Sequence, residues 1–289
     1  MLHTPFIQYL EEICSRIENR SVKLRAYEKI YGGDINDTYR LAMTHSDYFI
    51  KINAADKADM FEKEAKNLKI LSESNSFIIP EVFQHGIFEN KSFLLLQYIE
   101  NLETTGNIGD FAENLVKLHQ NRQDSYGLNF DNYIGKIAQK NTVATHWVDF
   151  YIQNRLQFQI DLAGDKIPTH IKKNFNRLYQ KLSTIIPVEK ASLLHGDLWN
   201  GNYFYNLQGK AVLFDPAVYY GHREIDLAMM SLFGGFEQEI YRIYHDLFPL
   251  EPDWKNRLKI YQLYPLLVHV NLFGASYLSA IQQILKYFV

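Results

Sequence analysis

The spacing of apolar residues over the first part of the chain predicts one helix followed by a meander of strands. Residues 5–18 place apolar side chains at helical intervals. The stretch VKLRAYEKIYGGDINDTYRLAMTHSDYFIKIN then has the composition of strands broken by turns. Its first arm ends at Gly32-Gly33-Asp34, a second covers residues 36–43, and a third is YFIKI. We therefore expect three consecutive strands here.

A second helix and further strands are expected next. ADKADMFEKEAKNLKILSES has an amphipathic helical pattern, and EVFQHGIFE and SFLLLQYI are strand candidates. Later residues are mostly helical in pattern, except for a hairpin formed by NYFYN and KAVLFD. A composition shift near residues 101–106 suggests a boundary. The predicted fold is α+β with two lobes: residues 1–101 with a five-stranded antiparallel sheet, and residues 102–289, mainly helical. A ligand is expected between them.

Composition narrows the function classes. The 289 residues are 47% hydrophobic and 22% charged, with a net charge of −3, so no overall basic field points to nucleic acid or an anionic membrane. Cys14 is the single cysteine and lies on an apolar helical face, which favours a buried thiol. The start of the chain does not resemble a signal peptide, and polar residues interrupt the apolar run at 261–280, so we expect a core helix or helix pair and a cytoplasmic protein.

The stretch LLHGDLWNGNYFYN contains the densest candidate chemistry. Asp197 and Asn202 are five positions apart, and Asp215 follows the hairpin. This pattern is typical of phosphoryl transfer, in which an Asp deprotonates a hydroxyl and a nearby Asn holds a metal ion. Mg²⁺ prefers oxygen ligands and takes one or two carboxylates, which Asn202 and Asp215 would satisfy. His195 is expected to hold the loop by hydrogen bonds.

A lysine for phosphate binding is expected in the third strand. Lys51 lies among apolar residues, and an unpaired buried charge is costly, so it needs a carboxylate partner. The following helix offers Glu62 and Glu64. We choose Glu64, because its spacing better matches the helix glutamate that pairs with the strand lysine in kinases.

Two further segments complete the expected nucleotide site. YGGDIN, with Gly32, Gly33 and Asn36, lies where a phosphate-covering loop belongs, although a plain hairpin turn explains the glycines equally well. The fifth strand ends in the expected hinge, where main-chain groups of Gln97, Tyr98 and Ile99 are candidates to bind adenine.

The chain resembles the fructosamine kinase (ketosamine-3-kinase) family of the aminoglycoside-phosphotransferase-like, protein-kinase-like superfamily. The resemblance rests on HGDLWNGN, FDPAVYYGHREIDLAMMSLFGGF, YGLNFDNYIGKIAQKN, MFEKEAKNLKIL and YGGDIN. It implies ATP-dependent, Mg²⁺-dependent phosphorylation of a sugar hydroxyl on a free or protein-bound ketoamine, in a deglycation role. It also implies that Asp197 accepts the proton, Asn202 and Asp215 hold Mg²⁺, Lys51 with Glu64 positions phosphates, and Asp226 braces the loop. Trp199 is a candidate to stack on the adduct, or else a core or lid residue.

Three alternatives stay open at this stage. The first alternative is another small-molecule kinase of the same superfamily, whose acceptor would be an aminoglycoside, choline or an amino-acid alcohol. His195, Asp197 and the distant His222 also resemble an HxD…H iron triad. A non-catalytic nucleotide-binding module is the third. HGD in place of HRD, and DP in place of DFG, argue against a regulated protein kinase. The sequence does not distinguish fructosamine from ribulosamine acceptors and carries no signal for oligomeric state.

Overall fold

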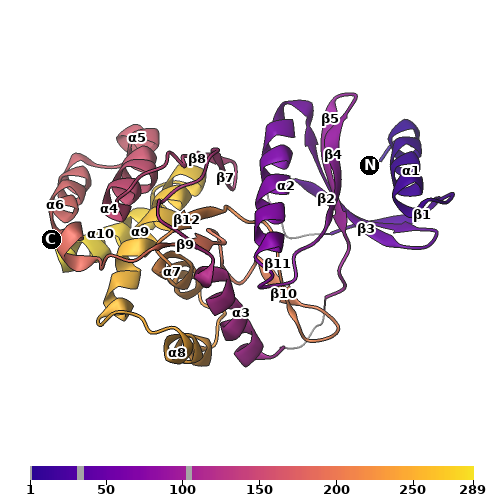
Figure 1. The fold of residues 1–289 in the computed structure, drawn as a ribbon. Coiled ribbons are helices and arrows are strands. Elements are labelled where there is room, and N and C mark those ends of the chain that lie inside the picture. The colour runs from indigo at the N-terminus through magenta and orange to yellow at the C-terminus, as the bar shows by residue number, and fades with distance from the viewer. Residues whose placement is uncertain (1, 31–35, 102–105) are drawn as a thin grey trace.

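The computed structural model describes residues 2–30, 36–101 and 106–289, which form two lobes (Figure 1). The first lobe contains α1 (Thr4–Glu18), β1 (Leu24–Lys29), β2 (Asp37–Met43), β3 (Asp47–Ala54), α2 (Ala58–Glu73), β4 (Val82–Phe88) and β5 (Lys91–Gln97). Its strands form one sheet in the order β1-β2-β3-β5-β4, with every neighbouring pair antiparallel. The predicted five-stranded lobe is confirmed. The division of the chain at residues 101 and 102 stays a prediction, because residues 102–105 lie outside the described ranges.

Helices cover both faces of this sheet. Apolar residues of α1 pack with Ile50 and Ile52 of β3 and with Phe93 and Leu95 of β5. Residues of α2 pack on the opposite face, against Leu94 and Leu96. Successive side chains of a strand point to opposite faces, so a strand buried on both sides is apolar throughout, as the LLL run in β5 is. By the same alternation, Lys51 faces α2.

The second lobe is mainly helical, and in its described part seven short strands form three small sheets around the predicted chemistry. Its helices are α3 (Ile108–Gln120), α4 (Trp147–Phe150), α5 (Phe158–Ala163), α6 (Thr169–Ile185), α7 (Glu224–Leu232), α8 (Gln238–Leu247), α9 (Trp254–Phe273) and α10 (Leu278–Phe288), with a π-helical segment at Tyr151–Gln157 and 3-10 turns at Gly164–Lys166 and η4 (Ala275–Tyr277). Its strands are β6 (Arg122–Gln123), β7 (Asn132–Ile134), β8 (Ile137–Gln139), β9 (Ala191–Leu194), β10 (Tyr203–Tyr205), β11 (Ala211–Leu213) and β12 (Tyr219–Gly221). The helices share one large apolar core with these strands.

The hairpin of β10 and β11 was predicted, whereas the sheet β12-β9-β6 and the hairpin β7-β8 were not. Strands this short are too brief to show a period, and β10 and β11 were recognised only because the turn Leu207-Gln208-Gly209 separates them. The hairpin β10-β11 also reaches the first lobe, since Leu213 N donates to Ile78 O at 3.0 Å. That contact fixes the segment preceding Asp215 against the first lobe.

Two smaller expectations are confirmed. Cys14 is buried in the core beneath the sheet. The apolar run at residues 261–280 spans the end of α9 and the start of α10, which separate at Gly274. No helix in the described parts of the chain combines the length and the apolar character that crossing a bilayer requires. A cytoplasmic location stays a prediction.

Candidate active site

Lys51 forms the predicted ion pair with Glu64. Its side chain is almost fully buried at the centre of β3, and Nζ lies 2.6 Å from Oε1 of Glu64 on α2. Glu62, the other candidate, instead pairs with Lys66 on the surface of the helix. Burial opposes the charge on Lys51, but the carboxylates of Asp215 and Glu64 outweigh it and raise the lysine pKa. The ammonium is therefore held charged, as phosphate binding requires.

Asp215 joins this pair from the other lobe. It follows β11, and Oδ1 accepts a hydrogen bond from Nζ of Lys51. Its backbone has a φ of +53°, which is unusual for a residue with a side chain and is characteristic of functional sites. The side chain is 43% exposed, so its carboxylate can reach a ligand as well as the lysine.

The loop after β9 is held by buried hydrogen bonds. Main-chain N–H groups of His195 and Gly196 donate to the two carboxylate oxygens of Asp226, at 2.8 and 2.9 Å. The ring of His195 accepts from Asp197 N at Nδ1 (3.3 Å), and its Nε2 lies 3.0 Å from Phe214 O, to which it must donate. Burial lowers the pKa of His195, so the ring is neutral. His195 and Asp226 thus position the loop, as predicted.

A glycine is required within this loop. Gly196 has a φ of +81°, and a Cβ atom there would lie 2.1 Å from the carbonyl oxygen of Ala217. The loop therefore packs backbone to backbone against the segment that follows Asp215. That close packing sets the distance between the two candidate catalytic segments.

Asp197 and Asn202 are in direct contact. Nδ2 of Asn202 donates to the main-chain oxygen of Asp197 at 2.8 Å and to its carboxylate at 3.1 Å. Burial, followed by the negative charge of Asp215, raises the pKa of Asp197 to about 7. A carboxyl group with that pKa can accept a proton near neutral pH. Among the described residues, none donates a hydrogen bond to the amide oxygen of Asn202.

A buried amide network behind Asp215 was not predicted. Asn67 on α2 donates to Pro216 O at 3.0 Å, Gln139 to Ala217 O at 3.0 Å and Asn132 to Val218 O at 2.8 Å. Asn132 also bonds to the side chains of Asn67 and Gln139. Three consecutive carbonyls are thus fixed by side chains of α2, β7 and β8. Asn132 and Gln139 lie in the segment DNYIGKIAQKN, which contributed to the family resemblance. The sequence did not show that these side chains form a network.

The structure gives less information on the residues predicted for the phosphate loop and the hinge. Asn36 accepts a hydrogen bond from Asn53 at 2.7 Å, and Gly32 and Gly33 lie outside the described residues. At the hinge, Gln97 N already donates to Glu81 O, whereas no main-chain hydrogen bond is found at Tyr98 or Ile99 among the described residues. Binding of adenine therefore stays a prediction that favours Tyr98 and Ile99.

Trp199 lies at the surface beside Asp197. Its side chain is 37% exposed and folds over Gly201, where a Cβ atom would lie 2.3 Å from the indole ring. It is therefore not a core residue.

The iron-triad alternative does not fit this geometry. Both ring nitrogens of His195 are engaged by backbone groups, and His222 stacks on Tyr261 in the core, with ring centroids 5.3 Å apart. Within residues 2–30, 36–101 and 106–289, no three His, Cys, Asp or Glu side chains are grouped to hold a metal ion.

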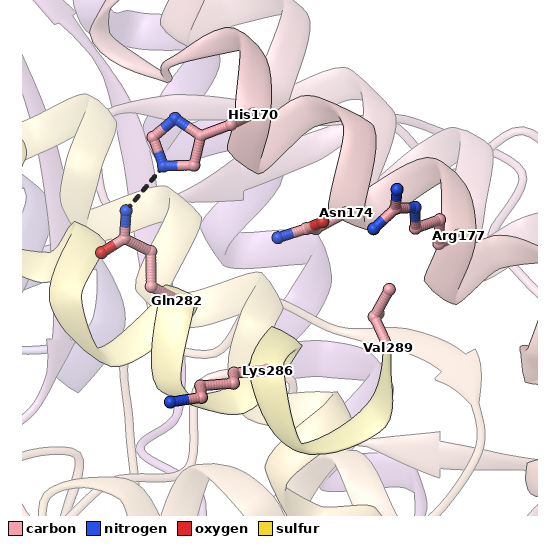
Figure 2. Close-up of a pocket in the computed structure, with 6 residues that line it drawn as sticks. All are labelled: His170, Asn174, Arg177, Gln282, Lys286 and Val289. Carbon is pink, nitrogen blue, oxygen red and sulfur yellow. Dashed lines mark hydrogen bonds between the residues drawn. The ribbon is translucent and has the colours of Figure 1, made fainter.

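A surface cavity of about 370 Å³ lies away from this chemistry (Figure 2). It is formed between α6 and α10, and His170 bonds to Gln282 across it. Its lining contains none of the predicted site residues: His170, Asn174, Arg177, Gln282, Lys286 and Val289.

Comparisons with known proteins show the family to which the chain belongs. The sequence pattern of the fructosamine kinase family matches residues 7–289. A protein of Enterococcus faecium named as a ketoamine kinase is 42% identical over 264 residues, covering 90% of this chain and 94% of that protein. The crystal structure of a protein from Haemophilus somnus 129PT assigned as a fructosamine-3-kinase has a TM-score of 0.87 at 31% identity, covering 97% and 96% of the two chains. The aminoglycoside phosphotransferase APH(4)-Ia shares the fold, with a TM-score of 0.61 at 14% identity over 98% and 99% of the chains. The chain therefore belongs to the fructosamine kinase family.

Proposed function

We propose that this kinase transfers the terminal phosphoryl group of ATP to a sugar hydroxyl of a ketoamine, with Asp197 as the base. The observation that carries this proposal is the position of Asp215. It bonds to the phosphate-binding candidate Lys51 and also contributes charge at Asp197. The groups needed for donor and acceptor thus converge from the two lobes.

Asp197 would orient the acceptor hydroxyl and take its proton as the new O–P bond forms. Its hydrogen bond from Asn202 fixes the carboxylate, and a pKa of about 7 makes it basic enough to hold that proton. The bond to the leaving diphosphate breaks in the same transfer, so one proton and one phosphoryl group move.

Lys51 would neutralise charge on the donor phosphates, with Glu64 fixing its ammonium group. Gly32, Gly33 and Asn36 would cover those phosphates, and main-chain groups of Tyr98 and Ile99 at the predicted hinge would hold adenine. The Lys51–Glu64 bond of 2.6 Å supports this assignment, since it orients a charged lysine before the donor binds.

Asn202 and Asp215 fit a magnesium ion. They offer an amide oxygen without a partner among the described residues and a partly exposed carboxylate, both hard oxygen donors. Bound there, Mg²⁺ would offset negative charge on the phosphates during transfer.

The acceptor class follows from the family and from relatives named for ketoamines. It includes free and protein-bound adducts, which would make the reaction a step in deglycation. Trp199, exposed beside Asp197, is our candidate for stacking on the sugar–amine adduct.

A panel of acceptors tests this proposal. Purified protein with ATP and Mg²⁺ should phosphorylate fructosyl-lysine and ribulosyl-lysine peptides, and should not turn over an aminoglycoside or choline. Product formation should be followed by mass spectrometry. Turnover of choline or an aminoglycoside without any ketoamine product would contradict the acceptor assignment, and ATP binding without any turnover would support a non-catalytic module.

A further inference from the structure

Five aromatic side chains form a partly exposed group beside the catalytic loop, which we call the aromatic patch: Trp199, Phe233, His269, Phe273 and Tyr277. Phe233 is 41% exposed and Phe273 is 58% exposed. Large apolar side chains gathered on a surface mark a binding site more often than single exposed ones do. The roles proposed above use only Trp199.

The rings of the aromatic patch contact one another in sequence. Ring centroids are 6.3 Å apart for Trp199 and Phe233, and 5.0 Å apart for Phe233 and His269. His269 is also 5.4 Å from Phe273 and 4.9 Å from Tyr277. A continuous aromatic surface thus runs from the catalytic loop to the end of α9.

The elements that carry these rings are fixed to the catalytic loop. A Cβ atom at Gly235, two residues after Phe233, would lie 2.6 Å from Cβ of Asn200 in that loop. On α9, Tyr264 is close enough to Asp197 that the carboxylate charge contributes, after burial, to raising the tyrosine pKa. The aromatic patch is therefore held near the point of phosphoryl transfer.

His269 adds a hydrogen-bond acceptor at the centre of the aromatic patch. Its Nδ1 lies 2.7 Å from the carbonyl oxygen of Pro265, which only accepts, so Nδ1 carries the proton. Burial lowers the pKa of His269, which keeps the ring neutral near pH 7. Nε2 then carries a lone pair, and among the described residues it has no hydrogen-bond partner.

We propose that the aromatic patch binds the amine-bearing arm of the ketoamine, with its secondary ammonium group against the ring faces and donating to Nε2 of His269. This inference rests on the proposed function. The amine of a ketoamine is cationic near neutral pH and lies a few bonds from the ring hydroxyls. If the sugar stacks on Trp199, the amine therefore reaches the neighbouring rings of the aromatic patch. Aromatic faces attract ammonium groups, and a neutral imidazole accepts their protons in hydrogen bonds.

The test compares two acceptors with the same sugar, a fructosyl-lysine peptide and an analogue whose linking nitrogen is acetylated and neutral. Phe233→Leu and Phe273→Leu should each raise KM for the cationic peptide about tenfold, with kcat and KM for ATP unchanged. KM for the neutral analogue should stay the same. Tyr287→Leu, at an exposed aromatic residue on α10, is the matched control and should change nothing. His269→Phe keeps a ring but removes the acceptor, and should also raise KM for the cationic peptide.

The outcomes separate this inference from the proposed function. An unchanged KM for the cationic peptide in both leucine variants, or an equal increase for the neutral analogue, would overturn the amine subsite alone. Failure of the wild-type protein to phosphorylate any ketoamine would overturn both. Because Phe233 and Phe273 are exposed, the variants should keep the wild-type Tm, which confirms that KM reports binding.

Discussion

Replacing Lys51 by Met separates the structural role of the Lys51–Glu64 pair from its catalytic role. Met has a similar length and fits a buried site, but it removes the positive charge between two carboxylates. Burial raises the pKa of Glu64, and the charge of Lys51, which opposes that rise, is lost in the variant. We therefore expect Lys51→Met to lower both stability and activity.

The size of the stability loss in Lys51→Met depends on how exposed the two carboxylates are. Removing one partner of a fully buried ion pair costs about 3–5 kcal/mol. The side chains of Glu64 and Asp215 are 17% and 43% exposed, so water stabilises the freed carboxylates and the cost should lie at the low end. A loss of about 3 kcal/mol corresponds to a fall in Tm of roughly 6 °C for a protein of this size. Loss of the phosphate contact should lower kcat/KM by roughly 100-fold or more.

The assay is thermal unfolding without nucleotide, together with steady-state kinetics on a ketoamine peptide. Lys51→Met/Glu64→Leu should recover most of the lost Tm but none of the activity, because the buried carboxylate is gone and the phosphate contact stays absent. Lys69→Met, on the exposed face of α2, is the control and should change Tm little. An unchanged Tm in Lys51→Met, or wild-type activity in the double variant, would refute the reasoning.

Three further changes test the rest of the site. Asn132→Ala leaves Val218 O without its buried donor and should cost about 1–3 kcal/mol in urea unfolding while lowering kcat; unchanged kcat would contradict the positioning role. Gly196→Ala should abolish activity because its Cβ meets Ala217 O, whereas Gly209→Ala, with a similar positive φ and no atom within 4 Å, should stay active; equal activities would disprove the close packing. Asp197 must be deprotonated to act as a base, so kcat/KM should rise with pH through an apparent pKa near or below 7. Bound Mg²⁺ lowers that pKa, because a nearby positive charge favours the carboxylate. A kcat/KM that stays flat from pH 5 to 8 would contradict the assignment.

Much of the fold was predictable because the first lobe is built from long, regular elements. The strands around Lys51 are apolar runs bounded by turns, and α2 has a clear apolar face, so both kinds of element can be recognised in the sequence. The short strands β6, β7, β8, β9 and β12 contain two to four residues each and have no such period. Their positions depend on contacts with distant segments, which a local pattern does not contain.

The candidate site also contains residues whose roles were predictable from the sequence and residues whose roles were not. Burial of Lys51 predicted that it needs a carboxylate partner, and Glu64 was chosen over Glu62 because its spacing matches the helix glutamate of kinases. The roles of His195 and Asp226 as supports also followed from the motif, and the structure confirms them. The amide network could not be predicted, because Asn67 and Asn132 meet only through long-range packing.

The most direct test of the central claim is the activity of Asp197→Asn. The substitution keeps the size of the side chain but removes the group proposed to take the proton. Phosphorylation of a fructosyl-lysine peptide should fall by about 100-fold or more, while the Kd for ATP, measured by calorimetry, stays close to that of the wild type. Asp165→Asn, at an exposed position, is the control and should be fully active. Turnover by Asp197→Asn at the wild-type rate would contradict the proposed mechanism.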